Sequence, residues 1–432
     1  MLRSLSVRVL IALIAGLALG AVAAAFAGPE VRRGVELFES IGGLWLNSLR
    51  MTVVPLIFAV LVTGIAGVAD AAATGRLAVR TLILIVALMT FSAVFALVFA
   101  AGFYAIWPLG AAGTAALRAG ASAAPDIVKQ APSLIDFIKG LAPPNLIEAA
   151  SQDAILPLVV FASFFGFAVT RLPEARRRSI TELFESIGEA MVTIVRWVLW
   201  AAPVGVFALA LGVGLRAGIG AAGEIGHYVA AISLGNVAMT LVAYVLAVAW
   251  GRVPLRRWTR AVAPVQVTAF ATQSSIACLP AMIEQSRDQL KVPDRVTGLV
   301  LPLAVALFRV TGPLANLGVA LFLVRVYGLE PSVGQYIGAT FVSVATSLAS
   351  VSLPGQVSFF ASIAPICLSL GLPLDLLPIL IAVEVIPDIF RTIGNVTGDM
   401  AITAILARGE KSSLDAKTTG EGDHEVVEGA RG

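Results

Sequence analysis

One stretch near the end of the chain, residues 384–408 (EVIPDIFRTIGNVTGDMAITAILAR), has the length and apolar content of a membrane span but contains charged and polar residues. These are Glu384, Asp388, Arg391, Thr392, Asn395 and Asp399. On an α-helix they fall within an arc of about 100°. Ionisable side chains at membrane depth are energetically costly, so they usually face a protein interior, a cavity or one another and mark a pathway.

Asp388 and Arg391 lie about one helical turn apart, and this anion–cation pair suits a zwitterionic solute with an additional acidic group. The alternative interpretation is a buried ion pair that only holds helices together. A structural pair does not need the two further polar turns that carry Asn395 and Asp399. We therefore favour a solute-binding face on this helix.

The composition is that of a membrane protein. The 432 residues are 58% hydrophobic and 13% charged, with a mean hydropathy of +0.92, whereas soluble proteins are about a quarter charged. Recurring long apolar runs predict an all-α polytopic membrane protein. The net charge of +3 does not indicate nucleic-acid binding, because the basic residues form short clusters between apolar runs. Two cysteines and two histidines provide neither a disulfide framework nor a metal centre.

The first part of the chain contains six predicted spans. They cover residues 7–27, 41–66, 77–107, 155–170, 186–214 and 225–250. The first run is too long for a cleaved signal peptide, so we expect it to remain as a span. A charged loop is expected at 30–39, and a milder Ala-, Gly- and Pro-rich segment at 108–153.

Alternate loops carry the arginines, which predicts cytoplasmic N- and C-termini in the cell's inner (plasma) membrane. The clusters are Arg3 and Arg8; Arg76 and Arg80; Arg171, Arg176, Arg177 and Arg178; and Arg252, Arg256, Arg257 and Arg260. Arg32 and Arg33 depart from this pattern, but acidic residues surround them.

Two apolar segments beyond Arg260 are interrupted by serines and end in Leu-Pro: TQSSIACLP (272–280) and TSLASVSLPGQ (346–356). Irregular backbone at membrane depth persists only where protein or a wet cavity surrounds it. A pair of interrupted segments at corresponding positions points to a midplane binding site in secondary transporters. Two ordinary kinked spans are the alternative.

Between these segments, residues 301–324 carry Arg309, Thr311, Gly312, Pro313 and Asn316, which predicts a helix broken near Gly312. An arginine at that depth needs a partner, and Asp399 or Asp388 is the candidate. The polar, Gly-rich tail at 409–432 is predicted to be disordered.

Three motifs resemble the dicarboxylate/amino acid:cation symporter family, the glutamate transporter homologues. RTIGNVTGD (391–399) is similar to the family's last-helix pattern, and SSIACLP and SVSLPGQ resemble the tips of its two re-entrant hairpins. The resemblance covers nearly the whole chain in span order. It implies eight transmembrane helices and two re-entrant hairpins in inverted repeats, a homotrimer in membrane lipid, and an elevator-type mechanism.

The resemblance also implies a division of the chain into domains. Scaffold spans 1–2 would occupy residues 1–76, and scaffold spans 4–5 residues 108–214. The transport domain would contain span 3 at 77–107 and residues 215–408, which hold span 6, hairpin 1, the broken span 7, hairpin 2 and span 8.

The same resemblance assigns roles to individual residues. Asp388 would accept the substrate ammonium, and Arg391 would hold the side-chain carboxylate with two charge-assisted hydrogen bonds. Asp399 with the Asn395 carbonyl resembles half of a sodium site. The remaining predicted substrate contacts are Thr392, Asn395, Ser274, Ser275, Leu353, Pro354 and Gly355.

The broken helix departs from the family. Where the family has Asn-Met-Asp-Gly-Thr, residues 308–312 read Phe-Arg-Val-Thr-Gly, so two oxygen ligands for a further sodium are missing. The two hydroxyls Thr90 and Ser92, with no carboxylate, would make a poor sodium site. We hypothesise that the Arg309 guanidinium replaces a cation and pairs with Asp399. Glu384 is a candidate proton carrier, although a solvated or backbone-bonded glutamate is the simpler interpretation.

These features predict a secondary transporter of an acidic amino acid or a related C4-dicarboxylate, coupled to Na⁺ or H⁺ and without a cofactor. Sodium coupling would be reduced or lost if Arg309 replaces a cation. A sodium-independent exchanger or facilitator, or a neutral amino acid transporter of the same fold, is the alternative. An anion channel is less favoured, because the polar residues cluster in the final third. The sequence contains no GxxxxGK[ST] or HExxH motif for an enzyme.

Overall fold

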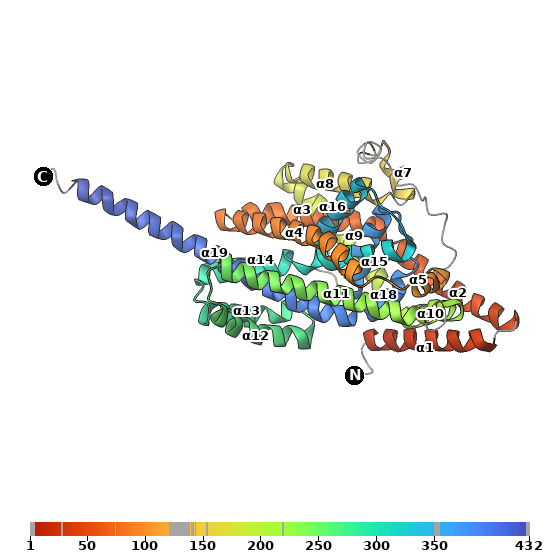
Figure 1. The fold of residues 1–432 in the computed structure, drawn as a ribbon. Coiled ribbons are helices and arrows are strands. Elements are labelled where there is room, and N and C mark those ends of the chain that lie inside the picture. The colour runs from red at the N-terminus through yellow and green to blue at the C-terminus, as the bar shows by residue number, and fades with distance from the viewer. Residues whose placement is uncertain are drawn as a thin grey trace.

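The computed structural model describes residues 5–26, 29–73, 75–120, 139, 142, 144–152, 154–217, 220–349 and 355–428, in which every extended regular element is a helix (Figure 1). The N-terminal half contains α1 (Leu5–Phe26), α2 (Pro29–Arg50), α3 (Val53–Ala73), α4 (Arg76–Ile106), α5 (Ala111–Gly120), α7 (Leu146–Ser151), α8 (Ile155–Thr170), α9 (Glu174–Trp200) and α10 (Ala202–Ala217). The C-terminal half contains α11 (Gly220–Val245), a π-helical turn η1 (Leu246–Trp250), α12 (Leu255–Thr272), α13 (Ser275–Asp288), α14 (Asp294–Leu307), α15 (Thr311–Tyr327), α16 (Val333–Ala349), α17 (Gly355–Ser369), α18 (Leu377–Val383) and α19 (Val385–Glu428). The all-helical prediction is confirmed for the described residues.

Helices α1 and α10 pack together over much of their length, and small residues make the contact possible. A Cβ atom added at Gly20 would lie 2.3 Å from the Leu211 carbonyl oxygen, and one at Gly214 would lie 2.4 Å from the Leu17 carbonyl oxygen. Gly16 and Gly20 are four residues apart on the same face of α1, the spacing of close helix pairs in membranes. The backbones therefore approach closely because both surfaces carry glycine.

The structure corrects the prediction of a charged loop at 30–39, because α2 is helical from Pro29 to Arg50. One face of this helix is apolar and buried, with Val35, Trp45 and Leu49 in the core. This amphipathic pattern favours a helix despite the charges on the other face. The single span predicted at 41–66 is divided at Met51–Thr52, before α3 begins.

Other predicted spans agree with the structure to different degrees. The runs predicted at 77–107 and 155–170 correspond to α4 and α8. The run at 186–214 is two helices, α9 and α10, bent by 59°. The bend falls just before Pro203, in the first turn of α10, where the missing proline N–H breaks no intrahelical hydrogen bond.

The C-terminal half contains helix pairs at both interrupted segments. Helices α12 and α13 meet at Gln273, which has a left-handed backbone (φ 50°) and ends α12. Ser274 then caps α13, because its Oγ accepts a hydrogen bond from the Ala277 N–H at 3.3 Å. Helices α16 and α17 flank the second segment, and its tip at 350–354 lies outside the described residues. The predicted break near Gly312 is observed at residues 308–310, between α14 and α15.

In the structure, α19 continues to Glu428 and extends away from the body of the molecule (Figure 1). The disorder that the sequence predicts from Gly409 stays a prediction. No proline interrupts the sequence after Arg408, and helix can propagate one residue at a time once α19 is formed.

Among the described residues, four helices are long and apolar enough to cross a membrane, or five if the bent α9–α10 pair is one span. The sequence predicted eight. Shorter apolar helices at 8–24 and 156–170 account for part of the difference, because they have fewer than 18 residues. The last predicted span contains more charged residues than a simple apolar span. These include Glu384, Asp388, Arg391 and Asp399.

The packing of α1 on α10 predicts opposite effects of alanine at two glycines. Gly20→Ala places a methyl group against the Leu211 carbonyl, and we expect it to destabilise the protein by about 1–3 kcal/mol. Gly34→Ala on α2 is the matched control, since nothing lies within 4 Å of its added Cβ and alanine favours helix over glycine. Thermal unfolding in detergent measures both. A Gly20→Ala variant as stable as Gly34→Ala would contradict the packing.

Candidate functional site

The six polar and charged residues predicted to share one face of the last helix face protein in the structure. Glu384, just before α19, and Arg391, Thr392, Asn395 and Asp399 on it are all buried, and Asp388 is partly exposed. Helix α19 packs against α11, α12, α14 and α15. The charged residues therefore lie in the interior of the molecule, as expected for ionisable groups of a membrane protein.

Two glycines on α19 allow the broken helix to approach these residues. A Cβ at Gly394 would lie 2.4 Å from the Thr311 Cγ2 atom, and one at Gly398 would lie 2.7 Å from the Val310 Cγ1 atom. Because the two glycines are four residues apart, they form a groove along one side of α19. The break between α14 and α15 sits in this groove.

Asn395 and Thr311 join α19 to the start of α15. The Asn395 Oδ1 atom accepts hydrogen bonds from the Thr311 N–H at 3.1 Å and from its hydroxyl at 2.8 Å. The same hydroxyl lies 3.0 Å from the Arg391 carbonyl oxygen. The N-cap residue of α15 is Val310, and its side chain makes no capping hydrogen bond. The Asn395 side chain therefore accepts the hydrogen bond of the Thr311 N–H, which the helix itself leaves without a partner. The sequence placed Asn395 in the site but did not identify Thr311 as its partner.

Arg391 forms an ion pair with Glu384 inside the protein. The other Glu384 oxygen accepts a hydrogen bond from the Tyr228 hydroxyl on α11 at 2.8 Å. The Arg391 Nε atom is buried and has no hydrogen-bond partner among the described residues. The sequence suggested Glu384 as a candidate proton carrier, with a solvated or backbone-bonded glutamate as the simpler interpretation, and did not identify Tyr228 as its partner. A tyrosine within an apolar span was the available signal, because a buried hydroxyl needs a partner.

Asp388 and Thr392 lie one turn apart on the same face of α19, and Thr392 directly follows Arg391. The Thr392 hydroxyl donates to the Asp388 carbonyl oxygen at 2.9 Å. The Asp388 carboxylate is close enough to interact electrostatically with both Arg391 and Arg309. Because Asp388 is partly exposed and Glu384 and Asp399 are buried, solvent reaches the Asp388 carboxylate most readily.

Asp399 is fully buried, and neither carboxylate oxygen accepts a hydrogen bond within the described part of the chain. No hydrogen bond therefore joins Asp399 to Arg309, and the pairing of these two residues stays a hypothesis. The Arg309 guanidinium nevertheless acts on the Asp399 charge and is half-buried at the break. A buried carboxylate is costly unless a cation or a proton compensates it.

The residues around Asp399 do not fit a complete sodium site. The Asn395 Oδ1 atom is used by Thr311, and the break offers Phe308 and Val310 side chains instead of oxygen ligands. No group of three or more His, Cys, Asp or Glu side chains able to hold a metal occurs among the described residues. Hard cations need several oxygen ligands, and Asp399 supplies one carboxylate beside a guanidinium.

The first hairpin reaches the same region. Ser274 and Ser275 are half-buried at the start of α13, and Cys278, one turn further on, is buried within electrostatic range of Asp399. On the second hairpin, Leu353 and Pro354 lie outside the described residues, and Gly355 begins α17.

The first arm of the second hairpin is attached to the broken helix. The Asn316 Nδ2 atom donates to the Ser347 hydroxyl at 3.2 Å, and the Ser343 hydroxyl donates to the Pro313 carbonyl oxygen at 3.0 Å. Both contacts join α15 to α16. The two helices of the first hairpin, α12 and α13, therefore contact α19, and those of the second, α16 and α17, contact α15.

An apolar, all-helical protein with buried charges where a broken helix crosses its last long helix has the architecture of an integral membrane transport protein. Comparison with known proteins identifies the family. The chain belongs to the sodium:dicarboxylate symporter family, whose sequence profile matches residues 5–409. This confirms the resemblance seen in the three motifs, and the members of this family are transporters rather than enzymes.

Curated relatives match along nearly the whole chain. The proton/glutamate-aspartate symporter of Escherichia coli (strain K12) is 27% identical over 94% of this chain and 93% of its own length. The C4-dicarboxylate transport protein of Bacillus subtilis (strain 168) is 25% identical over 99% of this chain and 98% of its own. The neutral amino acid transporter A of Homo sapiens is 29% identical over 96% of this chain and 82% of its own.

The junction of α15 and α19 predicts a specific stability effect. Thr311→Val keeps the shape of the side chain but removes the hydroxyl between Asn395 and Arg391, and we expect a loss of about 1–3 kcal/mol. Thr90→Val on α4 is the matched control, because its exposed hydroxyl bonds only to the Val86 carbonyl of its own helix at 2.8 Å. Thermal unfolding of the two purified variants measures the difference. Equal melting temperatures would argue against a structural role for the Thr311 hydroxyl.

Proposed function

We propose that the chain is a secondary active transporter of an acidic amino acid or a related C4-dicarboxylate. The observation that carries this proposal is the buried Arg391, which has an unused Nε donor and lies one turn from the partly exposed Asp388. A carboxylate ligand fits the guanidinium fork, and an ammonium group fits Asp388. The names of the bacterial relatives, a glutamate-aspartate symporter and a C4-dicarboxylate transport protein, support the same substrate class.

The hydrogen bonds of Asn395 and Thr392 refine the proposed contacts with substrate. The Asn395 Oδ1 atom already serves Thr311, so its amide nitrogen is the group that remains to donate to a substrate carboxylate. Thr392 contributes its hydroxyl from the same face. Ser274 and Ser275 at the first tip, with the backbone at 353–355 at the second, complete the proposed set around the main carboxylate.

Glu384 gives the proposed site a means of proton coupling. In the described conformation, its carboxylate holds Arg391 and accepts from Tyr228. A substrate carboxylate that takes over Arg391 would leave Glu384 buried without a cationic partner. A buried carboxylate in that position favours the neutral form, so a proton would accompany the acidic substrate.

Arg309 bears on sodium coupling. Its guanidinium is near both Asp388 and Asp399, so a fixed positive charge stands where the family pattern has a neutral residue between oxygen ligands. We propose that Arg309 compensates Asp399 in place of a metal cation. Transport would then be coupled to protons, or proceed as exchange, with little or no dependence on sodium.

An elevator mechanism and a homotrimer are part of the proposal, with the domain division given by the resemblance. Two ion pairs among the described residues cross the proposed boundary. Arg50 at the end of α2 lies 2.9 Å from Asp375, in the loop before α18, and Arg216 on α10 pairs with Glu39 on α2. Movement of residues 215–408 against the scaffold would have to break both. Because Arg50 and Arg216 are partly exposed, these contacts cost little to break. Cytoplasmic termini remain the orientation that we propose.

A neutral amino acid is the second candidate substrate. In the described conformation, the charge of Arg391 is already neutralised by Glu384. If this pair persists when substrate binds, the site presents Asp388 to an ammonium group but offers no free guanidinium to a side-chain carboxylate. The similarity to the human neutral amino acid transporter A is consistent with this candidate.

Uptake into proteoliposomes distinguishes these substrates. We expect L-aspartate or L-glutamate to be taken up in preference to succinate and L-serine, and Arg391→Ala combined with Glu384→Gln to reduce acidic uptake about a hundredfold. The double variant removes both charges of the pair and so avoids a lone buried carboxylate. Retention of acidic uptake in this variant would overturn the role of Arg391, and preferred uptake of L-serine by the native chain would favour the second candidate.

The role of Arg309 is tested by sodium dependence. We expect the native chain to transport equally in sodium and in choline, and Arg309→Met to lose at least about tenfold in choline, because Asp399 loses its compensating charge. Sodium should restore part of the loss. Arg295→Met, an exposed arginine on α14, is the matched control. A native chain with steep sodium dependence would contradict the substitution of a cation by Arg309.

A further inference from the structure

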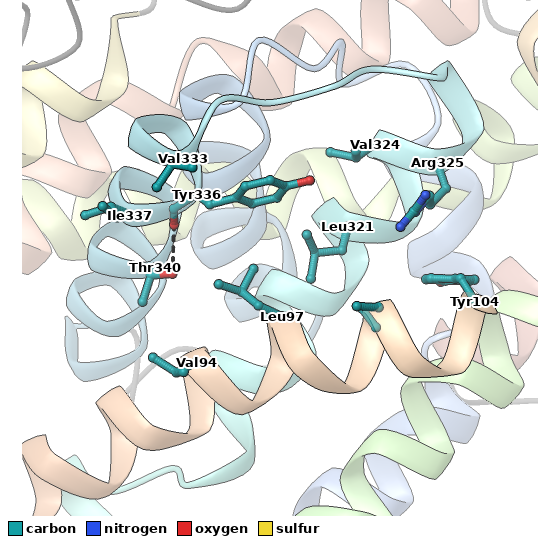
Figure 2. A pocket seen from close by; sticks show the side chains of 12 residues that line it. Val94, Leu97, Tyr104, Leu321, Val324, Arg325, Val333, Tyr336, Ile337 and Thr340 are labelled. Atoms are coloured by element: carbon teal, nitrogen blue, oxygen red, sulfur yellow. Dashed lines mark hydrogen bonds between the residues drawn. The ribbon is translucent and has the colours of Figure 1, made fainter. Parts of the chain in front are cut away.

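A cavity with a volume of about 550 Å³ lies between α4, α15 and α16, away from the charged residues around Arg391 (Figure 2). Its walls are largely apolar, with Val94 and Leu97 from α4, Leu321 from α15 and Ile337 from α16. Val94 and Ile337 are 48% and 57% exposed, so the cavity opens on the outer surface of the helices. In a membrane protein, that surface faces lipid.

One end of the cavity is polar. Arg325 from α15 points toward Tyr104 of α4, and the Tyr336 ring of α16 extends toward the same end (Figure 2). Arg325 is exposed and forms no ion pair with any described residue. An arginine with aromatic hydroxyls beside it is a recognition group for phosphate.

The C-terminal end of α15 does not use the Arg325 guanidinium. The Val326 carbonyl accepts a hydrogen bond from Arg118, and the Gly328 N–H donates to the Arg325 carbonyl at 3.2 Å. These contacts satisfy carbonyl groups that a helix end leaves free. The guanidinium of Arg325 is therefore available to a ligand.

The dimensions of the cavity match one leaflet of a bilayer. Tyr104 lies one turn before Trp107, which is half exposed just after the end of α4, and aromatic residues of this kind mark the membrane–water interface. Val94 lies ten residues further back along α4, about 15 Å deeper along the helix. This is about half of the 30 Å hydrocarbon thickness of a bilayer.

We propose that this cavity binds one acyl chain of an anionic phospholipid, with the phosphate head group on Arg325. The apolar walls accept the chain, and the single positive charge at the interfacial end selects an anionic head group over a zwitterionic one. Basic pockets between membrane helices bind anionic lipid head groups in this way. Since α16 is the first arm of the second hairpin, the bound chain would lie against the helix that leads to its tip.

Lipid titration of the purified full-length chain by native mass spectrometry tests the proposal, with phosphatidylglycerol and phosphatidylcholine of identical acyl chains as probes. We expect one tightly bound phosphatidylglycerol per chain. Arg325→Gln should weaken it about fivefold, to the affinity of phosphatidylcholine. Arg176→Gln, an exposed arginine on α9, is the matched control and should change nothing.

Two variants fill the cavity from opposite walls: Ala101→Trp on α4 and Ile337→Trp on α16. Both positions are exposed, so the larger side chains can be accommodated, and both variants should lose the tightly bound lipid. Inorganic phosphate added alone should give no thermal stabilisation, because the acyl chain supplies most of the binding.

Several outcomes would overturn the proposal. These are unchanged phosphatidylglycerol affinity in Arg325→Gln, retention of the bound lipid in both tryptophan variants, or protection by free phosphate equal to that by the lipid. If Arg325→Gln instead lowers the yield of oligomer and leaves lipid affinity unchanged, the surface belongs to a second copy of the chain and not to lipid.

Discussion

Burial of charge beside a broken helix is the constraint on which the rest of this structure depends. Asp399 is completely buried without a hydrogen bond from the described residues, Glu384 and Arg391 form an internal ion pair, and Arg309 lies within electrostatic range of the group. Removing one member of a buried pair costs about 3–5 kcal/mol. The arrangement is therefore stable only while each carboxylate has a cation, a proton or a substrate group to compensate it.

Backbone packing brings these charges together. Gly394 and Gly398 leave a groove on α19 that accepts Thr311 and Val310, and Asn395 then caps the start of α15. The break must occur at this place because the free N–H of α15 needs an acceptor, and α19 supplies one. The same break carries Arg309, whose guanidinium is within electrostatic range of Asp399. That Arg309 takes the place of a metal cation at this carboxylate is our proposal.

Much of the site followed from the sequence because its signal is local. Six polar positions on one face of an otherwise apolar helix predicted the buried stripe, and two serine-rich interruptions marked the places where hairpin arms begin. Tyr228 and Thr311 were not identified as partners, because they approach Glu384 and Asn395 across 156 and 84 residues of sequence. Contacts between residues so far apart in sequence depend on how the helices pack, which cannot be predicted from composition or local pattern.

The error at α2 has a different origin. Charged residues in α2 suggested a loop, yet Trp45 and Leu49 on the opposite face are buried and favour a helix. The resemblance implied eight spans, whereas four or five helices of the described residues are long and apolar enough to cross a membrane. Helix α19 is not among them, because its first turns carry charged residues.

If Arg309 takes the place of a metal cation, as we propose, substrate binding does not need sodium. Calorimetry measures the affinity of the purified chain for L-aspartate across a series of sodium concentrations, with choline holding the ionic strength constant. We expect a Kd that does not change with sodium. A Kd that falls steeply as sodium rises, with more than one ion bound per substrate, would contradict it.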